Sequence, residues 1–382
     1  YEITTRLVGS EMCIRDRICI IHCFDTYEHR VDLLHDYFKA KGTEVTVITS
    51  DYMHFEKRKR TDKKEDFHYI KAIPYASNLS LTRLWSHLRL SKNIFAKIES
   101  KEYDLLWVLI PPNCFVRDAA IYKRKYRETK LVFDVIDMWP ETMPIAKFKD
   151  LPPFTYWQKL RDKYLNAADA IVTECNLYQK KLPQTIDRKK LHTIYLARKL
   201  TPYQGKAELP QNRISLCYLG SVNNIIDIPA VAQLIRKLNK KLPVDIHIIG
   251  DGEKREEFVR ECKNAGAAVM YHGKIYDAKE KQKIFDQCHY GLNIMKASVF
   301  VGLTMKSMDY FEAGLPVINN IHGDTWDIIE REKIGVNLKE NTTAAEIMVY
   351  DVVMRERVRR FFETNLGEDT FQRKVKELLL EL

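Results

Sequence analysis

The sequence contains no apolar run long enough to cross a membrane. In a chain of 382 residues, no hydrophobic stretch approaches the roughly 20 residues that a spanning helix requires. The eight cysteines are scattered, without a C-x-x-C pair or a zinc-ligand spacing. This argues against a disulfide framework and a structural zinc site, and it favours reduced, buried thiols. No predicted strand is followed by G-x-G-x-x-G, so the usual dinucleotide-binding loop is missing.

Length and composition instead indicate a globular protein of two domains. The chain is too long for one ordinary core and fits two domains of roughly 150–200 residues. Hydrophobic residues make up 45% and charged residues 30%, the balance of a soluble globular protein. The formal charge of +10 lies entirely in residues 1–200, since residues 201–382 are balanced. A one-sided positive field favours an anionic partner, such as a phospholipid surface, a lipid diphosphate or nucleic acid.

Residues 1–17 follow no hydrophobic period and lack the apolar core of a signal peptide, so they do not indicate secretion. The string LVGSEMCIRDR within them resembles a translated adaptor remnant of assembled sequence data. We therefore interpret residues 1–17 as a non-native leader and expect the native chain to begin just before Ile18.

From Ile18 onward, short apolar runs alternate with helical patterns. The run ICIIHC is typical of a buried parallel strand, and a helical pattern closed by Gly42 follows it. Further strands are expected at 45–49, 67–72, 104–110, 130–136, 169–173 and 191–195. The alternation predicts a parallel sheet covered on both faces, and we assign residues 18–196 to a first Rossmann-like domain.

Residues 197–212 interrupt the pattern with two prolines and no apolar period, which predicts a linker. The alternation restarts at ISLCYLG and continues through VDIHIIGDG, AAVMYHG, HYGLNIM and LPVINN. Residues 213–365 are therefore expected to form a second Rossmann-like domain. Residues 366–382 have helical spacing of apolar side chains, and this last helix could pack on either domain, including back on the first.

Parallel sheets bind ligands beyond the carboxyl ends of their strands, so the turns there are candidate sites. The turn Gly220–Asn224 begins with a glycine that lets the backbone approach a ligand, and Ser221 adds a hydroxyl. A generic turn has the same form. The turn 250–252 is interpreted as structural, with Asp251 capping the next helix. The turn 272–275, which contains Lys274, could read a nucleobase edge.

The strongest motif is GLTMKSMDYFEAGLPVINN, residues 302–320. Gly302 permits a tight turn, and a helix is predicted directly after it, over 303–313. The first amides of this helix would be free to bind an anion, and Lys306 adds a full positive charge. The amides concerned are those of Leu303, Thr304 and Met305.

Asp309 lies on the same predicted helical face as Lys306 and can accept two hydroxyl hydrogen bonds. An anion site with a carboxylate one turn away suits a nucleoside diphosphate. The alternative is an ordinary surface ion pair between Lys306 and Asp309, worth about 0.2–0.5 kcal/mol.

The second half resembles the donor domain of family-4 glycosyltransferases of the GT-B fold. The likeness covers roughly residues 214–340, through LGS, IIGDG, HGKI and G-L-x-x-K-x-x-[ED]-Y-x-x-x-G-L-P-V-I in that order. The first half resembles the family more loosely, through DMWPE at 137–141 and AADAIVTEC. The resemblance implies an α/β GT-B fold, with two Rossmann-like domains facing each other across a cleft. Within the family, the chain is most similar to enzymes that build bacterial capsular or exopolysaccharide repeat units on a lipid carrier.

By that resemblance, Lys306 and the neighbouring amides would hold the donor diphosphate, Asp309 the ribose, Ser221 the phosphates, and the Lys274 loop the base. The implied donor-binding set is Gly220, Ser221, Asn223, Lys274, Gly302, Leu303, Thr304, Met305, Lys306 and Asp309.

Two positions depart from the family pattern. The first acid of the usual E-x(7)-E pair falls on Val301, which cannot accept a hydrogen bond from a sugar hydroxyl. The usual Arg and Lys after Gly220 are also replaced, by Val222, Asn223 and Asn224. Lys306 is therefore the expected diphosphate cation.

In the first half, Asp137 follows a predicted strand where family members carry a polar residue facing the donor sugar, so we predict catalytic roles for Asp137 and Lys306. The alternative for Asp137 is an N-cap of a helix beginning at Trp139 and Pro140. On the acceptor side, Asp25 and Thr26 follow the first strand. Arg30 begins the next helix and could reach a phosphate or be solvated.

No carboxylate occurs between Asp66 and Glu99, whereas Arg83, Arg89 and Lys92 all lie there beside an apolar helical stripe. A basic amphipathic helix with a tryptophan is typical of contact with an anionic membrane surface. The alternative is a core-packed helix with a solvated basic face.

These features predict a glycosyltransferase that moves a sugar from a nucleotide-diphosphate sugar, UDP-linked in our interpretation, to a lipid-linked or saccharide acceptor in cell-surface polysaccharide synthesis. The resemblance implies retention of configuration without a metal or other cofactor, and the sequence has no D-x-D motif. We expect a cytoplasmic protein, peripheral on the inner face of the cell membrane, with no nucleic-acid partner. The alternatives are a sugar-nucleotide epimerase of the same fold and a non-catalytic partner of another glycosyltransferase.

Overall fold

The computed structural model describes residues 16–78, 80–143, 150–200, 207, 209–350 and 352–382. They form two compact units, the first running to Ala197 and including Glu368–Leu382, and the second comprising Arg198–Gly367. Most of the expected leader lies outside the described residues. Arg17, however, already belongs to the first strand, and its backbone amide donates to Asp104 at 2.8 Å. The ordered sheet therefore starts one residue before Ile18.

A seven-stranded parallel sheet organises the first unit, in the order β5-β2-β1-β6-β7-β8-β9. Its strands are β1 (Arg17–Ile21), β2 (Glu44–Ser50), β5 (Phe67–Ile70), β6 (Leu105–Ile110), β7 (Lys130–Val135), β8 (Ala170–Thr173) and β9 (Leu191–Thr193). The short strands β3 (Tyr52–Met53) and β4 (Arg58–Lys59) pair separately as a hairpin. Every residue of β6 is buried, because helices cover both sides of the sheet.

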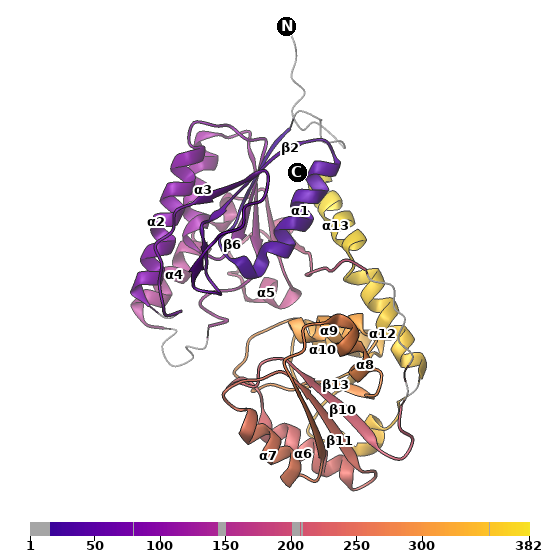
Figure 1. The fold of residues 1–382 in the computed structure, drawn as a ribbon. Coiled ribbons are helices and arrows are strands. Elements are labelled where there is room, and N and C mark those ends of the chain that lie inside the picture. Colours follow the sequence, from indigo (N-terminus) through magenta and orange to yellow (C-terminus); the bar gives the residue numbers. More distant parts are fainter. Residues whose placement is uncertain (1–15, 79, 144–149, 201–206, 208, 351) are drawn as a thin grey trace. The chain divides into compact units, whose positions relative to one another are not determined.

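The helices of the first unit are α1 (Glu28–Ala40), α2 (Leu81–Ile98), α3 (Cys114–Lys125), α4 (Pro152–Asp162), α5 (Asn176–Lys181) and α13 (Glu368–Leu380). In Figure 1, α2, α3 and α4 lie on one face of the sheet, while α1 and α13 lie on the other. Phe371, Val375 and Leu378 of α13 share a core with Val31 and Leu34 of α1. The end of the chain thus completes the core of the first unit.

A six-stranded parallel sheet organises the second unit, in the order β12-β11-β10-β13-β14-β15. Its strands are β10 (Ile214–Leu219), β11 (Val244–Ile249), β12 (Ala268–Gly273), β13 (Tyr290–Asn293), β14 (Val317–Asn319) and β15 (Gly335–Asn337). Its helices are α6 (Ile228–Asn239), α7 (Arg255–Asn264), α8 (Ala278–Phe285), α9 (Met305–Glu312), α10 (Asp324–Glu332), α11 (Ala344–Ile347) and α12 (Val352–Asn365).

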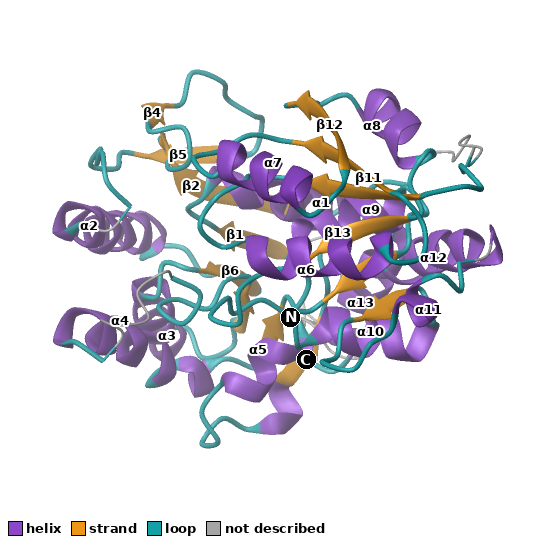
Figure 2. Cartoon of the chain, turned by 90° about the horizontal axis from the view of Figure 1, so that it is seen from below, coloured by secondary structure: helices purple, strands orange, loops and turns teal. Residues whose placement is uncertain are grey.

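Helices α6 and α7 lie on one face of the second sheet, with α8, α9 and α12 on the other (Figure 1), and Figure 2 distinguishes the helices, strands and loops of the chain by colour. The prediction of two parallel, doubly covered Rossmann-like sheets is confirmed. Among the described residues, no helix combines the length and the apolar character needed to cross a membrane.

Candidate functional site

The start of α9 lies at the carboxyl edge of the second sheet and is fixed by buried hydrogen bonds. Thr304 caps the helix, accepting from the Ser307 amide at 3.1 Å and donating to Asn293 at the end of β13, also at 3.1 Å. The Gly302 carbonyl accepts from the amide of Thr325, the second residue of α10, at 2.9 Å. The helix begins at Met305, two residues later than predicted. Its amides without an intrahelical acceptor are therefore those of Met305 and Lys306.

Lys306 projects from the first turn of α9 toward β10. Its ammonium nitrogen lies 4.6 Å from the centre of the Tyr218 ring, and burial lowers the pKa of the amine to about 7. No carboxylate of the described residues forms an ion pair with it. The alternative of a surface Lys306–Asp309 pair is wrong, because Asp309 binds other cations. Lys306 is thus a cation whose charge the described part of the chain does not neutralise.

Asp309 is held by two cations from distant parts of the second unit. Arg198 donates to its two oxygens at 3.1 and 3.5 Å, and the Lys281 amine donates at 3.0 Å. Arg198 also donates to Glu312 at 2.9 Å. These contacts orient the carboxylate and leave it lone pairs for a further donor, since an ionised carboxylate can accept about four hydrogen bonds.

The Gly220 turn lies beside the Gly250 turn, at the carboxyl ends of β10 and β11. Both glycines have positive φ, and a Cβ on Gly250 would stand 1.9 Å from the Gly220 carbonyl oxygen. Only glycine fits so close a backbone approach. Ser221 is exposed, and its carbonyl accepts from the Tyr218 hydroxyl at 2.8 Å. Tyr218 therefore connects the Gly220 turn to Lys306.

Other predicted donor residues lie nearby with fewer contacts. The Asn223 side chain accepts from the Ile225 amide at 3.1 Å, which shapes the Gly220 turn. Lys274 is exposed after β12, and the pKa of Asp251 is lowered first by the Gly252 amide and then by the charges of Arg255 and Lys274. The prediction that Asp251 caps α7 is wrong: it accepts from the Gly252 amide at 2.8 Å, while Lys254 occupies the N-cap position.

In the first unit, Asp137 follows β7 and accepts three side-chain hydrogen bonds. The donors are the Tyr27 hydroxyl at 3.1 Å, the Trp139 indole at 2.7 Å and the Thr142 hydroxyl. Burial raises the pKa of this carboxyl, whereas the hydrogen bonds act in the opposite direction. The alternative of a helix N-cap is wrong, because residues 137–143 form turns and no helix.

The residues expected on the acceptor side have different environments. Asp25 accepts from the Phe55 amide at 3.0 Å, and Thr26 is exposed in the same 3₁₀ turn, η1 (Asp25–Tyr27). Arg30 is buried and donates to both oxygens of Asp134, at 2.8 and 3.0 Å. Arg30 therefore supports the fold. The expectation that it reaches a phosphate or is solvated is wrong, because its guanidinium is buried against Asp134.

Helix α2 separates its basic residues into two groups. Arg89 and Lys92 are exposed on the same face as Leu81 and Trp85, whose exposed fractions are 75% and 59%. Arg83 is only 8% exposed and points inward. The grouping of Arg83 with the surface stripe is therefore wrong, because its guanidinium packs 4.1 Å from the centre of the Trp139 ring.

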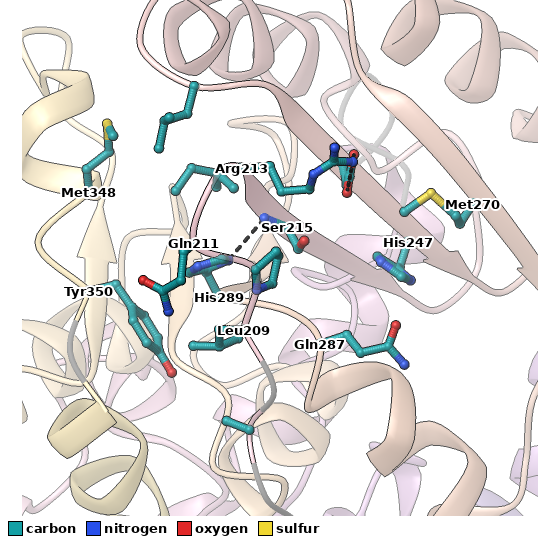
Figure 3. Close-up of a pocket in the computed structure, with 15 residues that line it drawn as sticks. Leu209, Gln211, Arg213, Ser215, His247, Met270, Gln287, His289, Met348 and Tyr350 are labelled. Carbon is teal, nitrogen blue, oxygen red and sulfur yellow. Dashed lines mark hydrogen bonds and ion pairs between the residues drawn. The ribbon is translucent and has the colours of Figure 1, made fainter.

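A large cavity of the second unit, about 1020 Å³, lies away from these turns. It opens at the amino edge of the sheet, where β10 and β11 begin (Figure 3). His289 accepts from the Ser215 amide at 3.1 Å, and Arg213 pairs with Asp245 at 3.1 Å. Its charged lining is thus paired internally, and the candidate site remains the opposite, carboxyl edge.

Comparison with known proteins finds a known domain family in the second unit. The family model described as Glycosyl transferases group 1 matches residues 213–349, which include β10, α9 and the turns described above. Those residues form a glycosyltransferase domain. No curated protein sequence matches the chain significantly.

Solved structures share the fold over most of the chain. Sucrose-phosphate synthase from Thermosynechococcus elongatus is 12% identical, with a TM-score of 0.66 over 95% of this chain and 98% of its own. The lipopolysaccharide outer core galactosyltransferase WaaB is 12% identical, with a TM-score of 0.65 over 95% and 99%. Anabaena HepE in complex with UDP is 14% identical, with a TM-score of 0.64 over 96% and 100%. These likenesses, at 12–14% identity, show the GT-B fold, and the assignment of the chain as a glycosyltransferase rests on the domain matched at residues 213–349.

Sequence reasoning missed the long-range partners of the site. Arg198 and Tyr218 gave no local signal, because each meets its partner from a separate element. A buried group of Cys23, His54 and His87, whose donor atoms lie within 4.8 Å of one another, was also missed. Its members are far apart in the sequence and carry no ligand spacing.

Proposed function

We propose that this glycosyltransferase moves a sugar from a UDP-linked or similar nucleotide-diphosphate sugar to a lipid-linked or saccharide acceptor in cell-surface polysaccharide synthesis. The proposed reaction retains anomeric configuration and needs no metal. The sugar C1–oxygen bond to the diphosphate breaks, a bond from C1 to the acceptor oxygen forms, and the acceptor proton passes to the leaving phosphate.

One observation carries the proposal: Lys306, at the start of α9, has no carboxylate partner among the described residues and is joined through Tyr218 to the Gly220 turn. Charge develops on the leaving diphosphate during transfer, and a positioned cation with helix amides stabilises it more than water does. The structure of HepE in complex with UDP, on the same fold, supports a nucleotide in this role.

The other predicted residues have assigned roles in the proposal. Asp309 binds the ribose hydroxyls with the oxygens that Arg198 and Lys281 orient. Asp137 acts toward the donor sugar, and burial raises the pKa of its carboxyl above the ordinary value. Val301 offers no carboxylate, so other groups must bind the hydroxyls of the donor sugar.

We further propose that α2 holds the enzyme at the cytoplasmic face of the membrane. Leu81 and Trp85 expose apolar surface beside Arg89 and Lys92. Apolar side chains that enter the interface next to cations that meet anionic lipids are the usual pattern of peripheral binding. A lipid-linked acceptor would be available at that surface.

The test is a thermal-shift screen of nucleoside diphosphates and nucleotide sugars, followed by product analysis with and without membrane lipids as acceptor source. We expect one nucleotide to raise the unfolding midpoint of the protein, and we expect the sugar of the corresponding nucleotide sugar to be transferred to a lipid. An isomerised sugar nucleotide without acceptor would instead identify an epimerase. Failure to hydrolyse or transfer any donor would leave a non-catalytic partner, the alternative that Val301 favours.

A further inference from the structure

Arg83, a buried arginine without a carboxylate partner in the described part of the chain, lies at the carboxyl edge of the first sheet. Arg83, in the first turn of α2, lies 4.1, 5.6 and 5.7 Å from the ring centres of Trp139, Phe24 and Tyr75. Its Nη1 donates to the Asn78 carbonyl at 2.7 Å, and its Nε is buried without an acceptor. Phe24 follows β1 and Trp139 follows β7, so the group lies where parallel sheets bind ligands.

Lys57 adds a second cation to the same place. Its amine lies 4.3 Å from the centre of the Tyr75 ring and donates to the Asn78 side chain and the His54 carbonyl. Burial first, and then the charge of Arg83, lower its pKa. Arg83 and Lys57 thus share an aromatic ring and an asparagine. No ion pair of either cation occurs among the described residues.

Among the described residues, Asp25 is a carboxylate that acts on Lys57, and it forms no ion pair with either cation. Burial raises the pKa of the Cys23 thiol well above its usual value, and it lowers the pKa of His54 to about 3 and that of His87 well below its usual range. All three are therefore neutral near pH 7. The Asp25 carboxylate is close enough to act on Lys57 electrostatically but binds the Phe55 amide.

A buried arginine and a half-buried lysine, neither in an ion pair with a described residue, concentrate positive charge at this place, and an anionic ligand would neutralise it. We infer that Arg83 and Lys57 bind a phosphate or diphosphate group of the acceptor, with Trp139, Phe24 and Tyr75 packing around the guanidinium. The inference rests on the proposed glycosyl transfer and names the chemical class of its acceptor. His87, buried with both ring nitrogens lacking partners, offers a further donor.

A metal ion is the competing occupant, since Cys23, His54 and His87 offer donor atoms within 4.8 Å of one another. Cys23 and His54 already contact each other at 3.2 Å, and the Tyr75 hydroxyl binds the second His54 nitrogen at 2.7 Å. A metal ion bound by these three residues would require the Cys23 thiolate, and it would add a further cation beside Arg83 and Lys57. The charge of the surroundings favours the anion.

The first test measures protection by sodium pyrophosphate at constant ionic strength, by thermal shift. It uses the Lys306→Ala protein, so that the proposed donor site does not contribute. Pyrophosphate should raise the unfolding midpoint, and adding Arg83→Gln should weaken its affinity about tenfold or more. Arg89→Gln, which removes the same charge from the exposed face of α2, should leave the affinity unchanged.

Lys57→Gln, at a more accessible side chain, repeats the test if Arg83→Gln does not fold, and it should also weaken the affinity. Equal protection of the Arg83→Gln and Arg89→Gln proteins, or no protection at all, overturns the inference. Protection by Zn²⁺ alone that is lost in Cys23→Ser overturns it in favour of a metal site.

A second arm compares farnesyl diphosphate with farnesol as probes. Arg83-dependent protection by the diphosphate but not the alcohol indicates a lipid-linked source of the phosphate. Protection by pyrophosphate alone indicates an acceptor without a lipid chain. UDP binding to the unaltered protein is measured in parallel. UDP binding without Arg83-dependent protection overturns only this inference, whereas the absence of binding by every nucleoside diphosphate in the screen overturns the proposed function.

Discussion

The ammonium nitrogen of Lys306 lies 4.6 Å from the centre of the Tyr218 ring, and the Tyr218 hydroxyl donates to the Ser221 carbonyl at 2.8 Å. This relationship joins the first turn of α9 to the turn after β10. It places a cation without an acid partner, among the described residues, beside backbone that only glycine can form. The predictions about donor binding follow from that arrangement.

Donor binding should depend on the protonation of Lys306. Burial lowers the pKa of its amine to about 7 in the free protein, and a bound diphosphate favours the protonated form. The affinity for UDP should therefore change little below about pH 7 and fall up to about tenfold per unit above it. Isothermal titration from about pH 6 to about pH 9, in buffers of different ionisation enthalpy, should also detect proton uptake. Affinity independent of pH over that range would contradict the assignment.

The same pKa has a consequence for stability. Burial lowers the pKa of the amine from its ordinary value of 10.5 to about 7 in the folded protein. The unfolded chain thus binds more protons between these values, and this group makes the fold more stable as pH rises through that window. Lys306→Met should remove the destabilisation present at neutral and lower pH, raising the unfolding midpoint there. Lys279→Met on the exposed surface of α8 is the control, and a lower midpoint for Lys306→Met would disagree with this account.

Asp309 should contribute to binding of the ribose of the nucleotide and not to binding of its phosphates. Asp309→Asn keeps the shape of the side chain but removes the charge that Arg198 and Lys281 orient. We expect UDP affinity to fall about tenfold, while pyrophosphate affinity remains close to that of the unaltered protein. Glu312→Gln, which removes another partner of Arg198, is the matched control. Equal losses for UDP and pyrophosphate would assign Asp309 a structural role only.

Arg30 should matter to folding and not to donor binding. Its buried ion pair with Asp134 also includes the Trp107 indole, which donates to the same carboxylate at 3.0 Å. Arg30→Met leaves that carboxylate buried without its cation and should cost about 3–5 kcal/mol of unfolding free energy. Arg30→Met with Asp134→Leu should recover most of the loss in denaturant titrations. A stable single variant with impaired ligand binding would instead indicate a role in the site.

Membrane binding should require the exposed stripe of α2. Arg89→Glu with Lys92→Glu should release the protein from vesicles that contain anionic lipid, and Trp85→Ala should weaken binding at every salt concentration. Arg236→Glu with Lys240→Glu makes the same charge change at two exposed positions of the second unit, in the last turn of α6 and directly after it. Sedimentation with the vesicles measures how much of each charge-reversed protein remains bound. The protein altered on α2 should be released, and the one altered in the second unit should be retained. Equal retention of both charge-reversed proteins would remove the membrane proposal.

The sequence predicted those features that local patterns determine. Apolar runs predicted the strands of both sheets to within one or two residues at most ends, and Gly302 with Thr304 predicted the region in which α9 begins. It could not predict partners that meet only through the fold. Arg30 and Asp134 are 104 positions apart, and Arg198 and Asp309 are 111 apart. Arg83 looked like its exposed neighbours, because inward and outward faces of a basic helix differ only in what packs on them.

The central claim is that Lys306 binds the donor diphosphate. Calorimetric titration of UDP into the unaltered, Lys306→Ala and Lys279→Ala proteins, near neutral pH, tests it most directly. The account predicts that Lys306→Ala weakens UDP binding roughly 10- to 100-fold, with circular dichroism unchanged, and that Lys279→Ala binds normally. A Lys306→Ala protein that binds UDP as tightly as the unaltered enzyme would contradict it.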